Sequence, residues 1–291
     1  MPKKSTKENE NYPSPNPLPP GEGARGRVKD GFSGEKLNTV FKGDIIGREI
    51  IFYEITASTN DRAMEIGERG IEGTIIIADA QEHGRGRFDR EWISPPDVNL
   101  YFTVLLKPPF LPKEATLITL MAAVAIVSAI REYTGLNAVI KWPNDILIRG
   151  KKAAGILTEM KSSMDRIDYI ALGIGVNVNM SLDMLPESVS TLATSLIIEK
   201  GQPVNRIELL GIILSKLEYW YKTLLSKEKK ALLKEWLHLD STIGKEISVK
   251  IQDRVVSGTA EGISEEGELI LRLSSGNIEK MCAGEVTILK N

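Results

Sequence analysis

The feature that most constrains this chain is a long connection between two apolar runs, residues 74–78 and 99–106. Both runs are rich in β-branched and aromatic residues, which predicts two buried strands. The connection covers about residues 79–98 and is much longer than an ordinary hairpin loop. Long connections in compact domains are typically either binding loops or unstructured segments. The residue types in this connection indicate which of the two it is.

The centre of the connection, residues 81–92, reads Q-E-H-G-R-G-R-F-D-R-E-W. Guanidinium groups bind phosphate or carboxylate through paired hydrogen bonds, and Gly84 and Gly86 let main-chain N–H groups approach the same anion. The arginines are Arg85, Arg87 and Arg90. This pattern favours a loop that covers an anion, although a solvated loop or a weak nucleic-acid patch has equal weight on these residues alone.

Composition narrows the chemistry that the rest of the chain supplies. With 291 residues, 42% of them hydrophobic, the chain is long enough for one large domain and a small one. A formal charge of −2 gives no general attraction to nucleic acid or anionic lipid, so we expect neither as a partner. The single cysteine, Cys282, excludes an intramolecular disulfide framework, and two histidines, His83 and His238, make a zinc site or a Cys–His nucleophile pair unexpected.

The start of the chain carries no recognisable targeting signal. Residues 1–43 are rich in Pro, Gly, Ser and Lys and bury too little to fold, so we predict a disordered tail in preference to a proline-rich ligand. The most apolar helical stretch, residues 117–130, is shorter than a membrane span. We therefore expect a cytoplasmic protein without a membrane segment.

From residue 44 onward, strand and helix patterns are mixed. Strands are predicted near residues 50–53, 74–78, 99–106, 138–142, 146–148, 153–159 and 169–179, and helices after Ser58, over 117–130, after Asn205 and around 232–237. From about residue 240 the pattern changes to five short alternating segments separated by Gly and Asn, which is typical of a small β-barrel. We predict an α+β fold, with a mixed β-sheet flanked by helices over 44–239 and a barrel over 240–291.

Several polar residues at the ends of these elements have both a structural and a functional interpretation. Ser58 with Asp61 resembles a helix-capping box, and a helix start that holds a polar ligand explains the pair equally well. Asn144 and Asp145 follow Pro143 in an ordinary Asx-type turn, or else meet a nucleotide edge and a magnesium ion.

The basic hairpin turn before residue 153 is similarly ambiguous. Lysines in such turns are usually solvated, but the small residues after Lys152 leave room beside it for a ligand. Asn177 lies at the end of an apolar strand, where an asparagine is more often structural.

Considered together, these stretches resemble the biotin–protein ligases. The motifs that carry the resemblance are Ser58-Thr59-Asn60, Gln81 followed by G-R-G-R at 84–87, Trp92-Ile93-Ser94-Pro95, Asn99-Leu100-Tyr101, K-W-P-N-D at 141–145, Lys152-Ala153-Ala154-Gly155-Ile156-Leu157 and Gly173-Ile174-Gly175-Val176-Asn177. They occur in the family's order and spacing over about residues 45–291, and together they are far more specific than any one of them.

The resemblance implies a catalytic fold related to class II synthetases and lipoate ligases, followed by an SH3-like barrel. It also implies two steps, in which biotin and magnesium-bound ATP give biotinyl-5′-AMP, and a lysine of a biotin carboxyl carrier protein domain then takes the biotinyl group. Neither step needs an enzyme nucleophile, because positioning and electrostatic stabilisation supply the rate. The long loop would then be a lid that protects the adenylate from water.

Matched positions imply residue roles as well. Lys152 and Arg87 would be catalytic, and Asp145 a magnesium ligand. The biotin-binding residues would be Ser58, Thr59, Asn60, Gln81, Gly84, Arg85, Gly86, Arg87, Lys152 and Gly155. The residues that bind ATP or the adenylate would be Arg85, Arg87, Arg90, Trp92, Asn144, Asp145 and Asn177.

The chain departs from the family pattern in two places. Phe88-Asp89-Arg90 stands where many members have a second glycine, and the N-terminal helix-turn-helix of bifunctional members is not recognisable, which implies ligase activity without operator binding. Both monomers and homodimers occur in the family. A lipoate–protein ligase and a non-enzymatic, biotin-responsive binding module are the alternatives. The G-R-G-R loop with K-W-P-N-D argues against the first, and Lys152 against the second.

Overall fold

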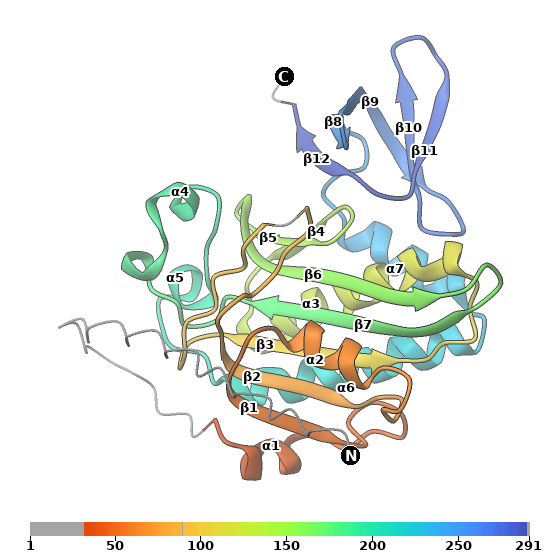
Figure 1. Cartoon of the computed structure of the whole chain (residues 1–291). Helices are drawn as coiled ribbons and strands as arrows, with labels where there is room; N and C mark the ends of the chain where they lie inside the picture. Colours follow the sequence, from red (N-terminus) through yellow and green to blue (C-terminus); the bar gives the residue numbers. More distant parts are fainter. Residues whose placement is uncertain (1–31, 89, 290–291) are drawn as a thin grey trace, which may run out of the picture.

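The computed structural model describes residues 32–88 and 90–289. In this part of the chain the first sheet consists of β1 (Ile50–Thr56), β2 (Ile75–Gln81), β3 (Leu100–Leu106), β4 (Ala138–Lys141), β5 (Asp145–Ile148), β6 (Lys151–Ser162) and β7 (Ile167–Val176). Its seven strands have the order β1-β2-β3-β7-β6-β5-β4 (Figure 1). β1 and β2 are parallel and the other neighbours are antiparallel, so the predicted mixed sheet is confirmed.

The second sheet follows the last long helix. It consists of β8 (Glu246–Ile251), β9 (Arg254–Ile263), β10 (Leu269–Leu273), β11 (Ile278–Met281) and β12 (Glu285–Ile288). All its pairings within the described residues are antiparallel, in the order β11-β10-β9-β8-β12. The five short alternating segments of the sequence therefore form one small, strongly bent sheet above the first (Figure 1).

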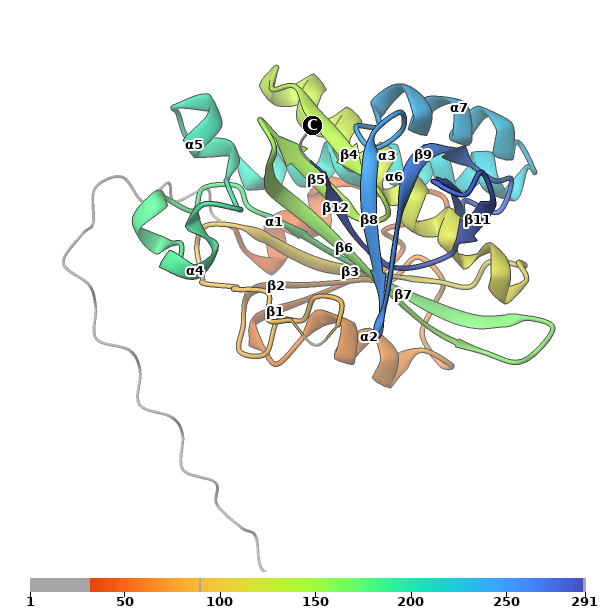
Figure 2. The same ribbon diagram turned by 90° about the horizontal axis from the view of Figure 1, so that it is seen from above.

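Helices surround the first sheet. They are α1 (Gly34–Val40), α2 (Thr59–Ile66), α3 (Ala115–Thr134), α4 (Glu187–Ser190), α5 (Leu196–Lys200), α6 (Arg206–Leu225) and α7 (Lys229–Leu239). Helices α3, α6 and α7 cover one face and α2 lies on the other (Figure 2). Every residue of β3 is buried, because this strand is paired on both sides and covered on both faces.

Two expectations need correction. The predicted tail up to residue 31 lies outside the described residues, but α1 begins at Gly34, and its Leu37 side chain is fully buried in the main core. The tail was therefore predicted to extend too far, since one buried leucine is too weak a pattern to stand out in a polar stretch.

The apolar stretch around 117–130 is longer than expected. The helical segment Pro112–Thr134 is, among the described residues, the one helix long and apolar enough to span a membrane, and 72% of its most apolar window is buried inside the protein. Its residues face the sheet and the helices α6 and α7, so packing explains its apolar character.

The segment between α7 and β8 joins the two sheets. The Ile140 carbonyl at the end of β4 accepts hydrogen bonds from the main-chain N–H and the hydroxyl of Ser241, each 2.8 Å long. The buried Thr242 hydroxyl accepts the Trp142 N–H at 3.0 Å, and the Trp142 indole N–H donates to the Gly267 carbonyl at 3.4 Å. Edge strand β4 is thereby fixed against the second sheet.

We predict that Thr242→Val destabilises the protein by about 1–3 kcal/mol, because a side chain of nearly the same shape leaves the buried Trp142 N–H unpaired. Urea unfolding measures this change. Thr223→Val is the control, since the Thr223 hydroxyl bonds to the Tyr219 carbonyl of its own helix, and we expect it to stay within about 0.5 kcal/mol. Equal stabilities for the two variants would show that Thr242 does not fix the junction.

Candidate functional site

A strip without side chains crosses the middle of the first sheet and forms the floor of the site. Gly155 on β6 is paired with Gly175 on β7. A Cβ atom at Gly175 would lie 2.5 Å from Cε2 of Trp92, and one at Gly155 would lie 3.0 Å from the same indole ring. At Gly173 a Cβ would lie 2.1 Å from Oδ1 of Asn60. The glycines therefore make the space in which Trp92 and Asn60 lie.

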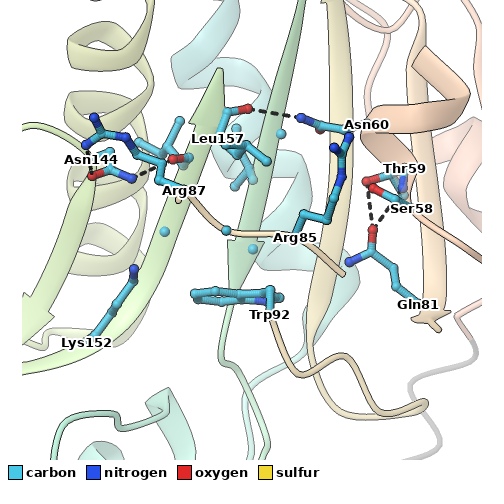
Figure 3. Close-up of a pocket in the computed structure, with 16 residues that line it drawn as sticks. Ser58, Thr59, Asn60, Gln81, Arg85, Arg87, Trp92, Asn144, Lys152 and Leu157 are labelled. Carbon is cyan, nitrogen blue, oxygen red and sulfur yellow. Dashed lines mark hydrogen bonds between the residues drawn. The ribbon is translucent and has the colours of Figure 1, made fainter. Parts of the chain in front are cut away.

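A first cavity of about 460 Å³ lies above this floor. Its lining residues are Ser58, Thr59, Asn60, Gln81, Arg85, Gly86, Arg87, Trp92, Asn144, Lys152, Gly155, Ile156, Leu157, Gly173, Ile174 and Gly175 (Figure 3). Of the residues that the resemblance assigns to biotin, the structure brings all but Gly84 together here. A Cβ at Gly84 would lie 2.3 Å from the Trp92 carbonyl, so this glycine permits close packing inside the loop and does not contribute to the wall.

One end of the first cavity is polar and rigid. The buried Thr103 hydroxyl lies 2.6 Å from Oδ1 of Asn60 and 2.9 Å from the Thr59 hydroxyl. The Asn60 amide donates to the Leu157 carbonyl and to Oε2 of Glu159, at 3.2 and 2.8 Å. Because both amide hydrogens of Asn60 already donate to protein acceptors, this side chain holds its neighbours in position as well as lining the cavity.

Gln81 continues this network toward the loop. Its carbonyl oxygen accepts from the N–H and the hydroxyl of Thr59, at 2.9 and 3.2 Å, and its amide donates to the Ser94 hydroxyl at 3.0 Å. Ser94 in turn donates to the Trp92 carbonyl at 2.8 Å. The sequence interpretation missed Thr103, Ser94 and Glu159. Thr103 was visible as a polar residue within an apolar run, and Ser94 was part of a motif, but neither received a role.

Ser58 is the N-cap residue of α2 and is buried in the wall of the first cavity. Its side chain makes no capping hydrogen bond, so the capping-box interpretation is wrong. The other interpretation, a helix start that holds a polar ligand, remains.

The arginine loop is a small hairpin in the described residues. The Trp92 N–H donates to the Gly84 carbonyl at 2.8 Å, and the Gly86 N–H donates to the Arg90 carbonyl at 2.6 Å. These bonds bring the two limbs of the loop side by side. Arg85 and Arg87 point in different directions from it (Figure 3).

Arg85 lies at the polar end of the first cavity. Its guanidinium is 2.5 Å from the Asp61 carboxylate and 3.1 Å from Glu159. It does not line the second cavity described below. The structure therefore offers no support for its predicted role at the adenylate, and Asp61 and Glu159 hold it at the opposite end.

Arg87 points toward the other end. It donates to Oδ1 of Asn144 at 3.3 Å and to the Gly284 carbonyl of the second sheet at 3.1 Å. Burial lowers the pKa of the Arg87 guanidinium, and the nearby carboxylates of Asp145 and Glu285 oppose this change. An arginine keeps its charge under such conditions, so Arg87 presents a partly desolvated cation to the cavity.

Lys152 lies where the two cavities meet. The register between β5 and β6 shifts here, because Ile146 pairs with Ala154 but Leu147 pairs with Lys152. The resulting β-bulge lies next to Lys152, just before Gly155 of the floor. The ammonium lies 2.5 Å from the Asp145 carboxylate and 5.3 Å from the centre of the Trp92 ring.

A second, larger cavity of about 1120 Å³ adjoins the first. Its wall includes six of the residues assigned to ATP, namely Arg87, Arg90, Trp92, Asn144, Asp145 and Asn177. Apolar residues of the β4 end and of the α4 region complete it, together with Gly284, Glu285 and Val286 of the second sheet. Five residues line both cavities, namely Gly86, Arg87, Trp92, Asn144 and Lys152. Two ligands, one in each cavity, would therefore be adjacent at the positively charged side chains of Arg87 and Lys152.

The cavity walls contain too few potential ligands to bind a metal ion without a substrate. No group of three or more His, Cys, Asp or Glu residues that could hold a metal occurs in residues 32–88 and 90–289. Asp145, the predicted magnesium ligand, is paired with Lys152. The described residues therefore do not form a metal site of their own, although an ion that arrives with nucleotide phosphates needs only one or two carboxylates.

The fold and the site together define a class. Two joined cavities with cations at the junction, and with no cysteine or histidine in either wall, suit ligases that activate a carboxylic acid on a phosphate. Residues 52–177 match the Biotin/lipoate A/B protein ligase family, and residues 242–289 match the Biotin protein ligase C terminal domain.

Individual relatives make the assignment specific. The biotin--[acetyl-CoA-carboxylase] ligase of Paracoccus denitrificans is 33% identical over 76% of this chain and 93% of its own length. The bifunctional ligase/repressor BirA of Bacillus subtilis is 34% identical over 85% of this chain and 76% of its own length. The biotin protein ligase of Aquifex aeolicus, solved with biotin and ATP, is 28% identical with a TM-score of 0.71, over 84% of this chain and all of that one. This chain belongs to the biotin–protein ligase family.

We predict that Gly175→Ala expels the Trp92 ring from the floor, because the new methyl group overlaps the indole. Acrylamide quenching of tryptophan fluorescence should increase, and the increase should vanish in a Trp92→Phe background. Gly262→Ala is the matched control, since a Cβ at this strand glycine meets no atom within 4 Å. Quenching that is unchanged by Gly175→Ala would mean that the strip does not hold the indole.

Proposed function

We propose that this chain forms biotinyl-5′-AMP from biotin and ATP and transfers the biotinyl group to a specific lysine of a biotin carboxyl carrier protein domain. In the first step a biotin carboxylate oxygen attacks the α-phosphorus of ATP, and the bond to pyrophosphate breaks. In the second step the acceptor amine attacks the acyl carbon, AMP leaves and the amine loses a proton. The observation that carries the proposal is the shared wall of the two cavities, with Lys152 and Arg87 in it.

We assign biotin to the first cavity, with its head group at the polar end. Thr59 and Gln81 are held by hydrogen bonds to each other, so they would meet the head group without reorganising. Ser58 has a hydroxyl that makes no cap bond, which supports a contact with the ligand. Arg85 would contribute at this end, and Asn60 would keep the wall in place.

We assign ATP to the second cavity, which is the larger one and suits the larger substrate. The buried Asn177, whose amide donates to the Thr194 carbonyl at 3.0 Å, and Asn144 would line the adenylate side. Trp142, Leu185 and Val189 provide apolar wall for a base. Arg90 pairs with Glu285 on the rim at 2.6 Å and would meet the outer phosphates.

The junction would stabilise the charge that develops during both steps. Negative charge grows on the oxygens around the α-phosphorus, and fixed cations in a partly dry site stabilise it most. Lys152 and Arg87 supply these charges. In the free protein Asp145 holds the Lys152 ammonium, so a substrate anion would replace this carboxylate as its partner. A magnesium ion would enter with ATP, and Asp145 would be one of its few protein ligands.

Several further points rest on the same proposal. Residues 44–239 would form the catalytic domain and 240–291 an SH3-like domain that closes the nucleotide end. A cytoplasmic location is part of the same proposal. The absence of nucleic-acid binding remains a prediction, and both a monomer and a homodimer are compatible with the proposal.

We expect pyrophosphate–ATP exchange to depend on added biotin. Exchange measures formation of the acyl-adenylate alone, so it needs no acceptor protein. Lipoate should not replace biotin, since the Paracoccus denitrificans and Aquifex aeolicus relatives are named as biotin ligases. Exchange that requires lipoate would show that the protein is a lipoate–protein ligase. Absence of exchange with either acid would indicate a non-enzymatic binding module.

We predict that Lys152→Ala lowers the rate of biotin-dependent exchange by roughly 100-fold or more, a loss typical for a group that stabilises developing charge. Lys151→Ala is the control, because Lys151 precedes it on β6 and lines neither cavity. Near-normal exchange in Lys152→Ala, with the variant folded, would remove this lysine from the mechanism.

A further inference from the structure

The first residue of α6, Arg206, is an arginine buried to 1% exposure. A cation is unfavourable at a helix N-terminus, and a buried charge is costly unless it is paired. The helix start itself is already satisfied, because the Asn205 side chain accepts the N–H groups of Ile207 and Glu208. The guanidinium carbon also lies 4.3 Å from the centre of the Phe32 ring, a contact that explains its stacking on one face. Capping does not account for a guanidinium at this position, so the partners of its N–H groups have to explain it.

The Arg206 guanidinium is directed at the base of the arginine loop. It donates to Oδ1 of Asp79 at 2.7 Å and to the Asn99 carbonyl at 3.2 Å. Asp79 belongs to β2, where the chain enters the loop, and Asn99 immediately precedes β3, where the chain leaves it. One buried side chain thus bonds to both ends of the segment that carries Arg85 and Arg87.

The Asp79 carboxylate joins the two limbs a second time. Its other oxygen accepts the N–H of Asp97 at 3.0 Å. Asp97 has a φ of +70°, in the left-handed region that costs energy for a residue with a side chain. The bond to Asp79 stabilises this turn of the returning limb.

The anchor is braced by elements outside the loop. Oδ1 of Asn99 accepts the Val178 N–H at 2.8 Å, and the Asn179 N–H donates to the Val98 carbonyl at 2.8 Å. The Asn179 side chain also bonds to the main chain of Val204, just before α6. The end of β7, the start of α6 and both loop limbs therefore form one hydrogen-bonded unit.

We propose that Arg206 is a positioning residue for the ligase reaction, which through Asp79 fixes the base of the arginine loop and so sets where Arg85 and Arg87 lie. The loop is a two-limbed hairpin, so a shift between its limbs at the base displaces the arginines near its tip. This inference rests on the proposed function for its kinetic consequence. Its structural consequence, the placement of the loop residue Trp92, is measured without any substrate.

The test uses Arg206→Met, which keeps the length of the side chain, and Asp79→Asn/Arg206→Met, which also removes the carboxylate left behind. In both variants we expect biotin-dependent exchange to fall at least tenfold in kcat, and acrylamide quenching of Trp92 to rise relative to a Trp92→Phe background. Biotinyl-5′-AMP should also escape faster, seen as more labelling of bystander lysines per adenylate formed than in the wild-type protein. Arg206→Lys should recover part of the exchange rate.

Arg131→Met is the control, because Arg131 near the end of α3 donates to the Ala138 carbonyl at 2.8 Å and lines neither cavity. We expect it to lower the melting temperature without changing kcat or quenching. A double variant that regains stability together with wild-type kcat and quenching would overturn the proposal, since Arg206 would then only neutralise Asp79. Absence of exchange in the wild-type protein would instead contradict the proposed function, and the quenching result would still decide the anchor.

Discussion

The site depends on a steric constraint, the absence of side chains at three positions in the centre of the first sheet. The paired Gly155 and Gly175 provide a flat surface for the Trp92 indole, and Gly173 leaves room for the Asn60 amide. A Cβ at Gly173 or Gly175 would overlap the side chain above it. Because the sheet is buried on its other face by α3 and α6, the chain cannot bend away to make this space elsewhere.

Polar groups around this floor are held in position before any ligand arrives. Thr103, Thr59, Gln81 and Ser94 form a continuous hydrogen-bonded series from the buried strand β3 to the arginine loop. Groups that are already oriented bind a ligand without a further loss of side-chain entropy. The Lys152 ammonium is held as well, by the Asp145 carboxylate 2.5 Å away, so neither charge is unpaired in the cavity wall.

The second sheet takes part in the site. The Gly284 carbonyl receives the Arg87 guanidinium, Glu285 pairs with Arg90, and both residues line the larger cavity. The Arg90–Glu285 pair is too exposed to contribute much stability, so its effect is on where the loop lies. The small C-terminal sheet thus forms part of the wall of the larger cavity, and the contacts made by Thr242 and Trp142 keep that wall in place.

The sequence by itself determined the kind of elements, their order and most of the residues that surround the cavities. Local patterns suffice for the elements, because alternation, the helix start at Asn205 and the apolar run at 117–130 reflect each segment's own environment. The site residues were recognised from the motifs that the chain shares with its family, not from local patterns. The tertiary structure decided which of these residues meet. Gly155 and Gly175 are paired by the register of two strands. Tertiary packing places Arg85 beside Asp61 and Arg87 beside the Gly284 carbonyl. The position of α6 brings Arg206 to Asp79, 127 residues away in the chain. Such contacts depend on how segments far apart in the chain are placed in space, so they cannot be predicted from the local pattern of a single sequence.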